Sequence, residues 1–241
     1  MNQQADEIAA ARSFYACALE ALQASGAPFM VGGAYGLQVY TGIARHTKDL
    51  DIFCTAGAYP HLLEALARAG YETQITDANW LAKAFQGDFF IDLIFDSANG
   101  LVRIEDYWLE DAVMADLFGC RVPIVPIVEL IWSKLYVDDR FRFDGADVNH
   151  LILAQGRTLD WHRLLGHMDR DWELLMSHLL MFRFVYPSEV DVIPDWLANE
   201  LLGRLQHQLE LPVPQDRVSR GPLLSRTQYQ VDIDRWGFKE R

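Results

Sequence analysis

The segment Phe29–Phe53 constrains the fold of this chain most, because it brings a glycine pair and two closely spaced acids together. It begins with a short apolar run that ends at Gly32 and Gly33. Residues 34–41 are typical of a helix, and a polar turn follows them. The alternating acidic and apolar residues of Asp49–Phe53 then predict a strand. The segment therefore predicts a strand, a glycine turn, a helix and a second strand, in this order.

The two acids of the second strand predict a metal site. Asp49 and Asp51 are two residues apart, so on a strand they point to one face, while Leu50 and Ile52 point to the other. Like charges held side by side need neutralisation, and a divalent cation is a common solution. A glycine pair at the start of a helix leaves backbone N–H groups open to a phosphate. Together these features indicate a site for a metal-bound nucleotide.

In this order, the glycine turn, the helix and the Asp-x-Asp strand resemble the core of the DNA polymerase β-like nucleotidyltransferase superfamily. The run GGAYGLQVYTGIARHTKDLDIF is most similar to the bacterial minimal, antibiotic-modifying and toxin-type branches. The resemblance implies that Gly32, Gly33, Arg45 and Lys48 bind the nucleotide. Many members of the superfamily have a serine after the glycines. Ala34 stands here, so one side-chain hydroxyl toward the phosphate is missing.

A third acid lies in the apolar run Asp88–Phe95, which predicts another strand. Asp92 is in the middle of this run, where a buried carboxylate is unfavourable unless it is paired or binds a metal. In the resembled superfamily a neighbouring strand supplies a third carboxylate. The resemblance therefore implies that Asp92 completes a catalytic and metal-binding trio with the Asp-x-Asp pair and accepts a proton from the attacking hydroxyl. The alternative is that Asp88 or Asp96 faces the site and Asp92 faces solvent.

The resemblance also implies the chemistry. Mg²⁺ (or Mn²⁺) on Asp49 and Asp51 would bind an NTP as donor substrate, and a second metal would lie between these acids and Asp92. An enzyme of this kind moves a nucleoside monophosphate from the NTP to a hydroxyl and releases pyrophosphate. The sequence does not select ATP or any other NTP as the donor.

The acceptor stays open between several classes. A small molecule such as an aminoglycoside or a lincosamide suits the acidic composition. A toxin-type enzyme acting on tRNA or protein suits the Thr-Lys-Asp-Leu-Asp run equally well. A third alternative is a nucleotide-binding or scaffolding protein that has lost turnover.

Composition limits these alternatives. The formal net charge of −13 argues against broad binding to nucleic acid, which depends on Lys and Arg at phosphates. Half of the 241 residues are hydrophobic, which excludes a disordered chain. The apolar runs are too short for a membrane span, and the first residues do not resemble a secretory signal. Three widely spaced cysteines indicate reduced thiols, so we expect a cytoplasmic protein without a membrane partner. The sequence does not predict an oligomeric state.

The whole chain predicts an α/β fold, in which a small mixed sheet with flanking helices precedes a helical C-terminal region. We expect a catalytic domain over residues 1–122, a helical domain over 123–211 and a docked C-terminal tail over 212–241. The tail contains three arginines that a substrate could use: Arg217, Arg220 and Arg226.

Two cations near the start of the predicted helical domain allow two interpretations. Lys134 and Arg142 could reach a phosphate, or they could pair with Asp144 and Asp147. Asp144 is also in the position of a helix N-cap, and Asp147 is in the first turn of the next predicted helix.

Overall fold

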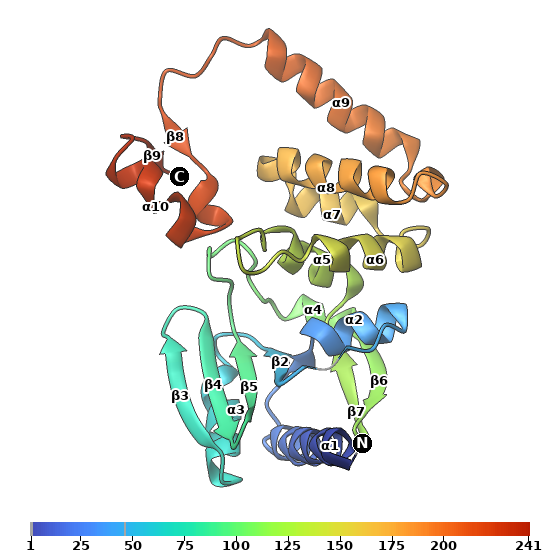
Figure 1. Cartoon of the computed structure of the whole chain (residues 1–241), viewed down its shortest axis with the longest axis vertical. Helices are drawn as coiled ribbons and strands as arrows, with labels where there is room; N and C mark the ends of the chain where they lie inside the picture. The colour runs from blue at the N-terminus through green and yellow to red at the C-terminus, as the bar shows by residue number, and fades with distance from the viewer. Residues whose placement is uncertain (1, 46) are drawn as a thin grey trace. The chain divides into compact units, whose positions relative to one another are not determined.

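The computed structural model describes residues 2–45 and 47–241 and divides the chain into two compact units, Met1–Pro126 and Ile127–Arg241 (Figure 1). In the described residues, the first unit contains a seven-stranded mixed sheet, and the second unit is mainly helical. The predicted α/β fold with a helical C-terminal region is confirmed.

The first unit has the strand order β3-β4-β5-β2-β1-β7-β6. Strand β2 runs parallel to β5, strand β1 runs parallel to β7, and the other neighbours are antiparallel. Its helices and strands are α1 (Asn2–Ala24), β1 (Met30–Val31), α2 (Gly33–Thr41), β2 (Asp49–Phe53), α3 (Tyr59–Arg68), β3 (Glu72–Asp77), β4 (Leu81–Gln86), β5 (Phe89–Ile94), α4 (Tyr107–Glu110), β6 (Val113–Leu117) and β7 (Cys120–Ile124).

The two faces of the central strands have different chemistry. Leu50, Ile52, Ile91 and Leu93 are fully buried in the core, together with the apolar faces of α1 and α3. Because side chains alternate along a strand, the residues between them point to the opposite face. The acids of β2 and β5 are on that opposite face, so packing of the core orients the acids.

The second unit consists of helices and a small two-stranded sheet, whose strands β8 and β9 enclose η3 and α10 in the sequence. Its elements are α5 (Ile127–Leu135), α6 (Gly145–Gln155), α7 (Trp161–His167), η1 (Asp169–Asp171), α8 (Trp172–Val185), η2 (Val190–Val192), α9 (Asp195–Glu210), β8 (Val218–Ser219), η3 (Gly221–Leu223), α10 (Arg226–Asp234) and β9 (Lys239–Glu240).

A buried charged cluster joins α5 to α6. Lys134 is 4% exposed, and its ammonium lies 2.8 Å from a carboxylate oxygen of Asp144 and 2.8 Å from one of Asp147. Arg142 also pairs with Asp144, at 3.2 Å. Lys134 and Arg142 therefore pair with acids of their own unit, which was the second of the two alternatives that the sequence left open. Asp144 occupies the N-cap position of α6 without a side-chain capping bond, because its carboxylate is engaged by the two cations.

The tail after α9 is folded and contacts the helices of its own unit. It includes the nine-residue helix α10, which the sequence did not predict because its apolar residues follow no clear helical period. Arg220 forms two hydrogen bonds with Glu173 on α8, at 2.9 and 3.2 Å. Arg226 pairs with Glu240, and Arg217 lies over the ring of Phe238. These arginines therefore have partners within the protein.

None of the helices in the described part of the chain combines the length and apolar character that crossing a bilayer requires.

Candidate functional site

Three carboxylates from β2 and β5 meet on the face of the sheet that is opposite the core. Asp49, Asp51 and Asp92 each offer an oxygen, and these oxygens lie within 4.8 Å of one another. All three residues are partly buried. We call this group the carboxylate trio.

The register of two parallel strands explains why the third acid reaches the first two. Asp51 on β2 is directly opposite Asp92 on β5, and Asp49 is opposite Phe90. Side chains that are opposite on neighbouring strands project to the same face. By contrast, Asp88 is exposed before β5 begins, and a carboxylate oxygen of Asp96 accepts a hydrogen bond from the amide of Ser97. Of the three acids that the sequence left open, the structure brings Asp92 to the pair.

Gly33 lies against the carboxylate of Asp51. Its φ of +53° is in the left-handed region that favours glycine, and a Cβ atom here would overlap Asp51 Oδ2. Gly33 is also the first residue of α2, where amides have no partner within the helix. The positive end of the helix dipole is therefore close to the carboxylate trio and favours negative charge there.

Gly32 has a different reason to be glycine. A Cβ atom there would collide with the ring of Phe53 on the neighbouring strand. Its amide donates to the carbonyl of Asp51 at 2.9 Å, so this N–H is used inside the protein. The other first-turn amides, which have no acceptor within the helix, are those of Gly33, Ala34 and Tyr35.

Lys83 is a site residue that the sequence reasoning missed. It is opposite Asp92 in the antiparallel pair of β4 and β5, and its Nζ is 2.6 Å from Asp92 Oδ1. The ammonium also lies 4.3 Å from the centre of the Phe90 ring. The alternating residues around Lys83 are compatible with a strand, but only the cross-strand register reveals which residue faces Asp92.

Hydroxyl-bearing side chains lie close to Asp49 of the trio. Thr47 donates a hydrogen bond from its side chain to Asp49, and its carbonyl accepts one from Tyr15 at 3.4 Å. Burial raises the pKa of Tyr35 to about 12, and the nearby charge of Asp49 adds to this effect. Burial likewise raises the pKa of Tyr15. Both phenols are therefore neutral at physiological pH, and neither adds charge to the site.

The predicted phosphate cations are on the loop between α2 and β2. Arg45 and Lys48 are exposed there. The carbonyl of Lys48 accepts a hydrogen bond from the amide of Phe90, which fixes the loop end beside β5. The roles of both side chains toward a triphosphate stay predictions. His46, in the same turn, lies outside the described residues.

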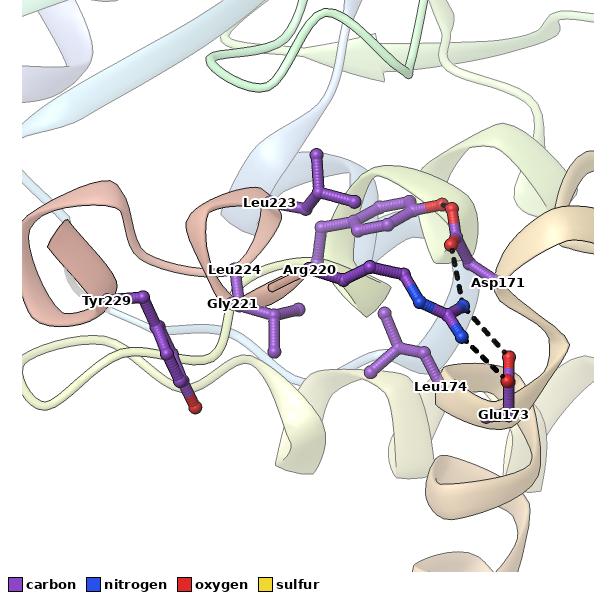
Figure 2. Close-up of a pocket in the computed structure, with 9 residues that line it drawn as sticks. Asp171, Glu173, Leu174, Arg220, Gly221, Leu223, Leu224 and Tyr229 are labelled. Carbon is purple, nitrogen blue, oxygen red and sulfur yellow. Dashed lines mark hydrogen bonds and ion pairs between the residues drawn. The ribbon is translucent and has the colours of Figure 1, made fainter. Parts of the chain in front are cut away.

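A pocket of about 370 Å³ lies within the C-terminal unit, between the tail and the start of α8. One wall is apolar and includes Leu174, Leu224 and Tyr229 (Figure 2). On the other wall the guanidinium of Arg220 lies between the carboxylates of Asp171 and Glu173 (Figure 2). The charged groups of this wall pair with one another across the contact between the tail and the helices. The pocket therefore lies at the packing interface of these two segments.

The donor set of the carboxylate trio fits a hard divalent cation. Mg²⁺, Mn²⁺ and Ca²⁺ prefer carboxylate oxygens, and all three groups here are carboxylates on rigid strands. Cys54 follows β2, but burial raises the pKa of its thiol to about 12, so it packs as an apolar side chain. The trio therefore provides oxygen ligands for a metal such as magnesium or manganese.

No protein-family model matches the sequence, and neither does any curated protein. Among solved structures, the chain is similar to the antibiotic-resistance factor ANT(2'')-Ia, with 15% identity and a TM-score of 0.49 over 69% of this chain and 97% of that one. It is also similar to the lincosamide antibiotic adenylyltransferase LnuA, with 16% identity and a TM-score of 0.42 over 58% and 94%. A third is JHP933 from Helicobacter pylori, with 16% identity and a TM-score of 0.38 over 90% and 94%. These three TM-scores are below 0.5, so the assignment of the site depends on its own geometry.

Proposed function

We propose that this protein is a metal-dependent nucleotidyltransferase that moves a nucleoside monophosphate from an NTP to a hydroxyl of a small-molecule acceptor. The observation that carries the proposal is the carboxylate trio beside the N-terminus of α2. An acidic cluster alone would be weak support. Here, the glycine that packs against Asp51 lets an anion-binding helix end approach the acids directly.

Each side chain has a defined task in this proposal. Asp49 and Asp51 would hold the metal ion, and the amides of Gly33 and Ala34 would donate to phosphate oxygens. Asp92, whose Oδ1 accepts a hydrogen bond from Lys83, would accept the proton of the acceptor hydroxyl. A bound divalent cation would stabilise negative charge on the attacking and leaving oxygens. Arg45 and Lys48 are the cations of the adjoining loop and would offset charge on the departing pyrophosphate.

The proposed reaction is a single displacement at the α-phosphorus of the NTP. The acceptor oxygen forms a bond to the α-phosphorus, and the bond from that phosphorus to the bridging oxygen of the β-phosphate breaks. The hydroxyl proton passes to Asp92, and pyrophosphate leaves with the bridging oxygen.

The acceptor class follows from charge. A chain with a formal net charge of −13 attracts cationic small molecules and repels polyanions. We therefore propose a hydroxylated, amine-bearing small molecule, such as an aminoglycoside, in preference to RNA.

Calorimetric titration of Asp51→Asn with each of the four NTPs, with and without Mg²⁺, tests the metal site. We expect wild-type protein to bind at least one NTP only with Mg²⁺. Asp51→Asn should weaken that binding by more than about 100-fold, because even outer partners of metal ligands change affinity by 10–100-fold. The amide has nearly the shape of the acid, so the sheet should remain folded.

Asp88→Asn is the matched control, because it removes the same charge from an exposed acid just before the neighbouring strand β5. It should bind the nucleotide like the wild type. If Asp51→Asn also binds Mg²⁺ and NTP like the wild type, the assignment of the metal site is wrong.

A further inference from the structure

Lys83 brings a positive charge to Asp92 of the carboxylate trio from strand β4, which lies on the other side of β5 from β2. It is inside strand β4, with its backbone fixed by pairing to β3 on one side and to β5 on the other. Ala82 and Ala84 on either side of it are fully buried in the core, so Lys83 must project to the face that carries the acids.

The ammonium of Lys83 is held from two sides. It lies 2.6 Å from Asp92 Oδ1 and 4.3 Å from the centre of the Phe90 ring, in the geometry of a cation–π contact. The side chains of Lys83 and Asp92 are 23% and 15% exposed. An ion pair with so little solvent around it is screened much less than one on the surface.

A second metal that shares Asp92 with the Asp-x-Asp pair, as the resemblance implies, would have this ammonium as a neighbour. That metal would need an oxygen of Asp92, and Oδ1 already accepts from Lys83. A divalent ion on Asp92 would also lie close to the ammonium of Lys83. The two positive charges would repel each other. With Lys83 present, the net charge of the trio and its lysine is −2, which one divalent ion neutralises.

We propose that Lys83 replaces the second metal ion, so that the site binds a single divalent cation on Asp49 and Asp51. In this arrangement Lys83 is a positioning residue, because it holds Asp92 next to Asp51 and supplies fixed positive charge at that acid. The inference rests on the proposed function, since it assigns a role to Lys83 within the same site.

Counting bound Mn²⁺ in nucleotide-free, full-length protein tests this inference. The electron paramagnetic resonance signal of free Mn²⁺ gives the number of bound ions and their Kd without any turnover. We expect one strong ion per wild-type chain. In Lys83→Met a second ion should bind at least about tenfold more tightly than in the wild type, because a neighbouring charge changes ionic equilibria by one to three powers of ten.

Three further variants test whether the charge of Lys83, and not its shape, sets the number of bound ions. Lys83→Arg should keep the wild-type count, because the charge is retained. The double variant Lys83→Met with Asp92→Asn should also bind one ion, because both partners lose their charge. Lys239→Met removes the same charge from an exposed pair with Asp216 in the other unit and should bind like the wild type.

Two results would overturn the role of Lys83. One is the finding that wild-type protein binds two Mn²⁺ ions with similar Kd. This measurement is informative even if Lys83→Met does not fold. The other is a folded Lys83→Met with an unchanged count. If this variant with its unchanged count also loses NTP affinity, Lys83 is a phosphate ligand instead. Failure of the proposed function has a different signature, since Asp51→Asn would then retain Mn²⁺.

Discussion

Gly33 brings helix α2 into direct contact with the carboxylate of Asp51. Its left-handed backbone turns the chain from β1 into the helix, and its missing side chain leaves space for Oδ2 of the acid. These two requirements are separable, because other glycines of the chain meet only the first. Gly42, at the C-terminus of the same helix, has a φ of +75° and open space around its Cα.

We therefore expect Gly33→Ala and Gly42→Ala both to destabilise the fold, Gly33→Ala more because its Cβ also overlaps Asp51, and to differ in metal binding. Each places alanine in the left-handed region, which costs about 1–2 kcal/mol. Only Gly33→Ala displaces Asp51, so only this variant should lose Mn²⁺ binding. Urea unfolding followed by Mn²⁺ titration measures both quantities. Equal Mn²⁺ affinity in the two variants would show that the contact between Gly33 and Asp51 is not needed.

Residues of this kind are the part of the site that the sequence predicts best. Asp49, Asp51 and the glycines are close along the chain, so strand alternation and turn chemistry are enough to place them together. The sequence could not separate the tasks of Gly32 and Gly33, because the ring of Phe53 that excludes a side chain at Gly32 comes from another strand.

At the scale of elements, the sequence could not predict how strands that are distant in the chain pair with one another. Strand β2 was predicted with its bounds because its pattern is local, but its pairing with β5 depends on register between distant segments. Lys83 was missed for the same reason, since nothing in residues 79–85 shows which residue is opposite Asp92. Helix α10 was missed because its apolar spacing is weak. The domain boundaries and the roles of Arg45 and Lys48 stay predictions.

The pairing of α5 with α6 gives a stability prediction. Lys134→Met would leave Asp144 and Asp147 buried without their cation, and breaking a buried pair costs about 3–5 kcal/mol. Lys239→Met is the matched control, because that pair is exposed and should change the unfolding free energy by less than about 1 kcal/mol.

The pH dependence of the difference in unfolding free energy between wild type and Lys134→Met shows whether lost charge pairing causes it. Burial would raise the pKa of Asp144, but Lys134 and Arg142 outweigh burial and hold the pKa below its usual value. A lowered folded-state pKa stabilises the protein above the unfolded-state pKa, and this stabilisation is lost as the pH falls. The gap between wild type and Lys134→Met should therefore be largest near neutral pH and narrow below about pH 4. Denaturant unfolding across this range measures the gap, and a gap that does not depend on pH would indicate lost packing instead.

At the scale of the whole molecule, charge separates the possible acceptors. The chain has 34 acidic residues against 21 Lys and Arg, so it lacks the excess of cations that RNA binding uses. With an α-labelled NTP, we expect transfer of the label to an aminoglycoside and none to tRNA or to added protein. The apparent KM for the acceptor should rise as NaCl is increased from about 50 to 200 mM, because salt screens the attraction. Label on tRNA or on a protein would favour the toxin-type alternative.

Strand β2 is the middle strand of the sheet, with three strands on each side. Amides in such a position exchange with solvent only when much of the domain opens, which is rare on the timescale of enzymatic turnover. The carboxylates of Asp49 and Asp51 therefore keep their spacing whether or not an ion is bound. An arriving ion has to shed water to match this fixed set of oxygens, and Mg²⁺ does so reluctantly. The rate of metal uptake should consequently be set by dehydration of the ion, and Mn²⁺, which loses water more readily, should enter the site faster than Mg²⁺.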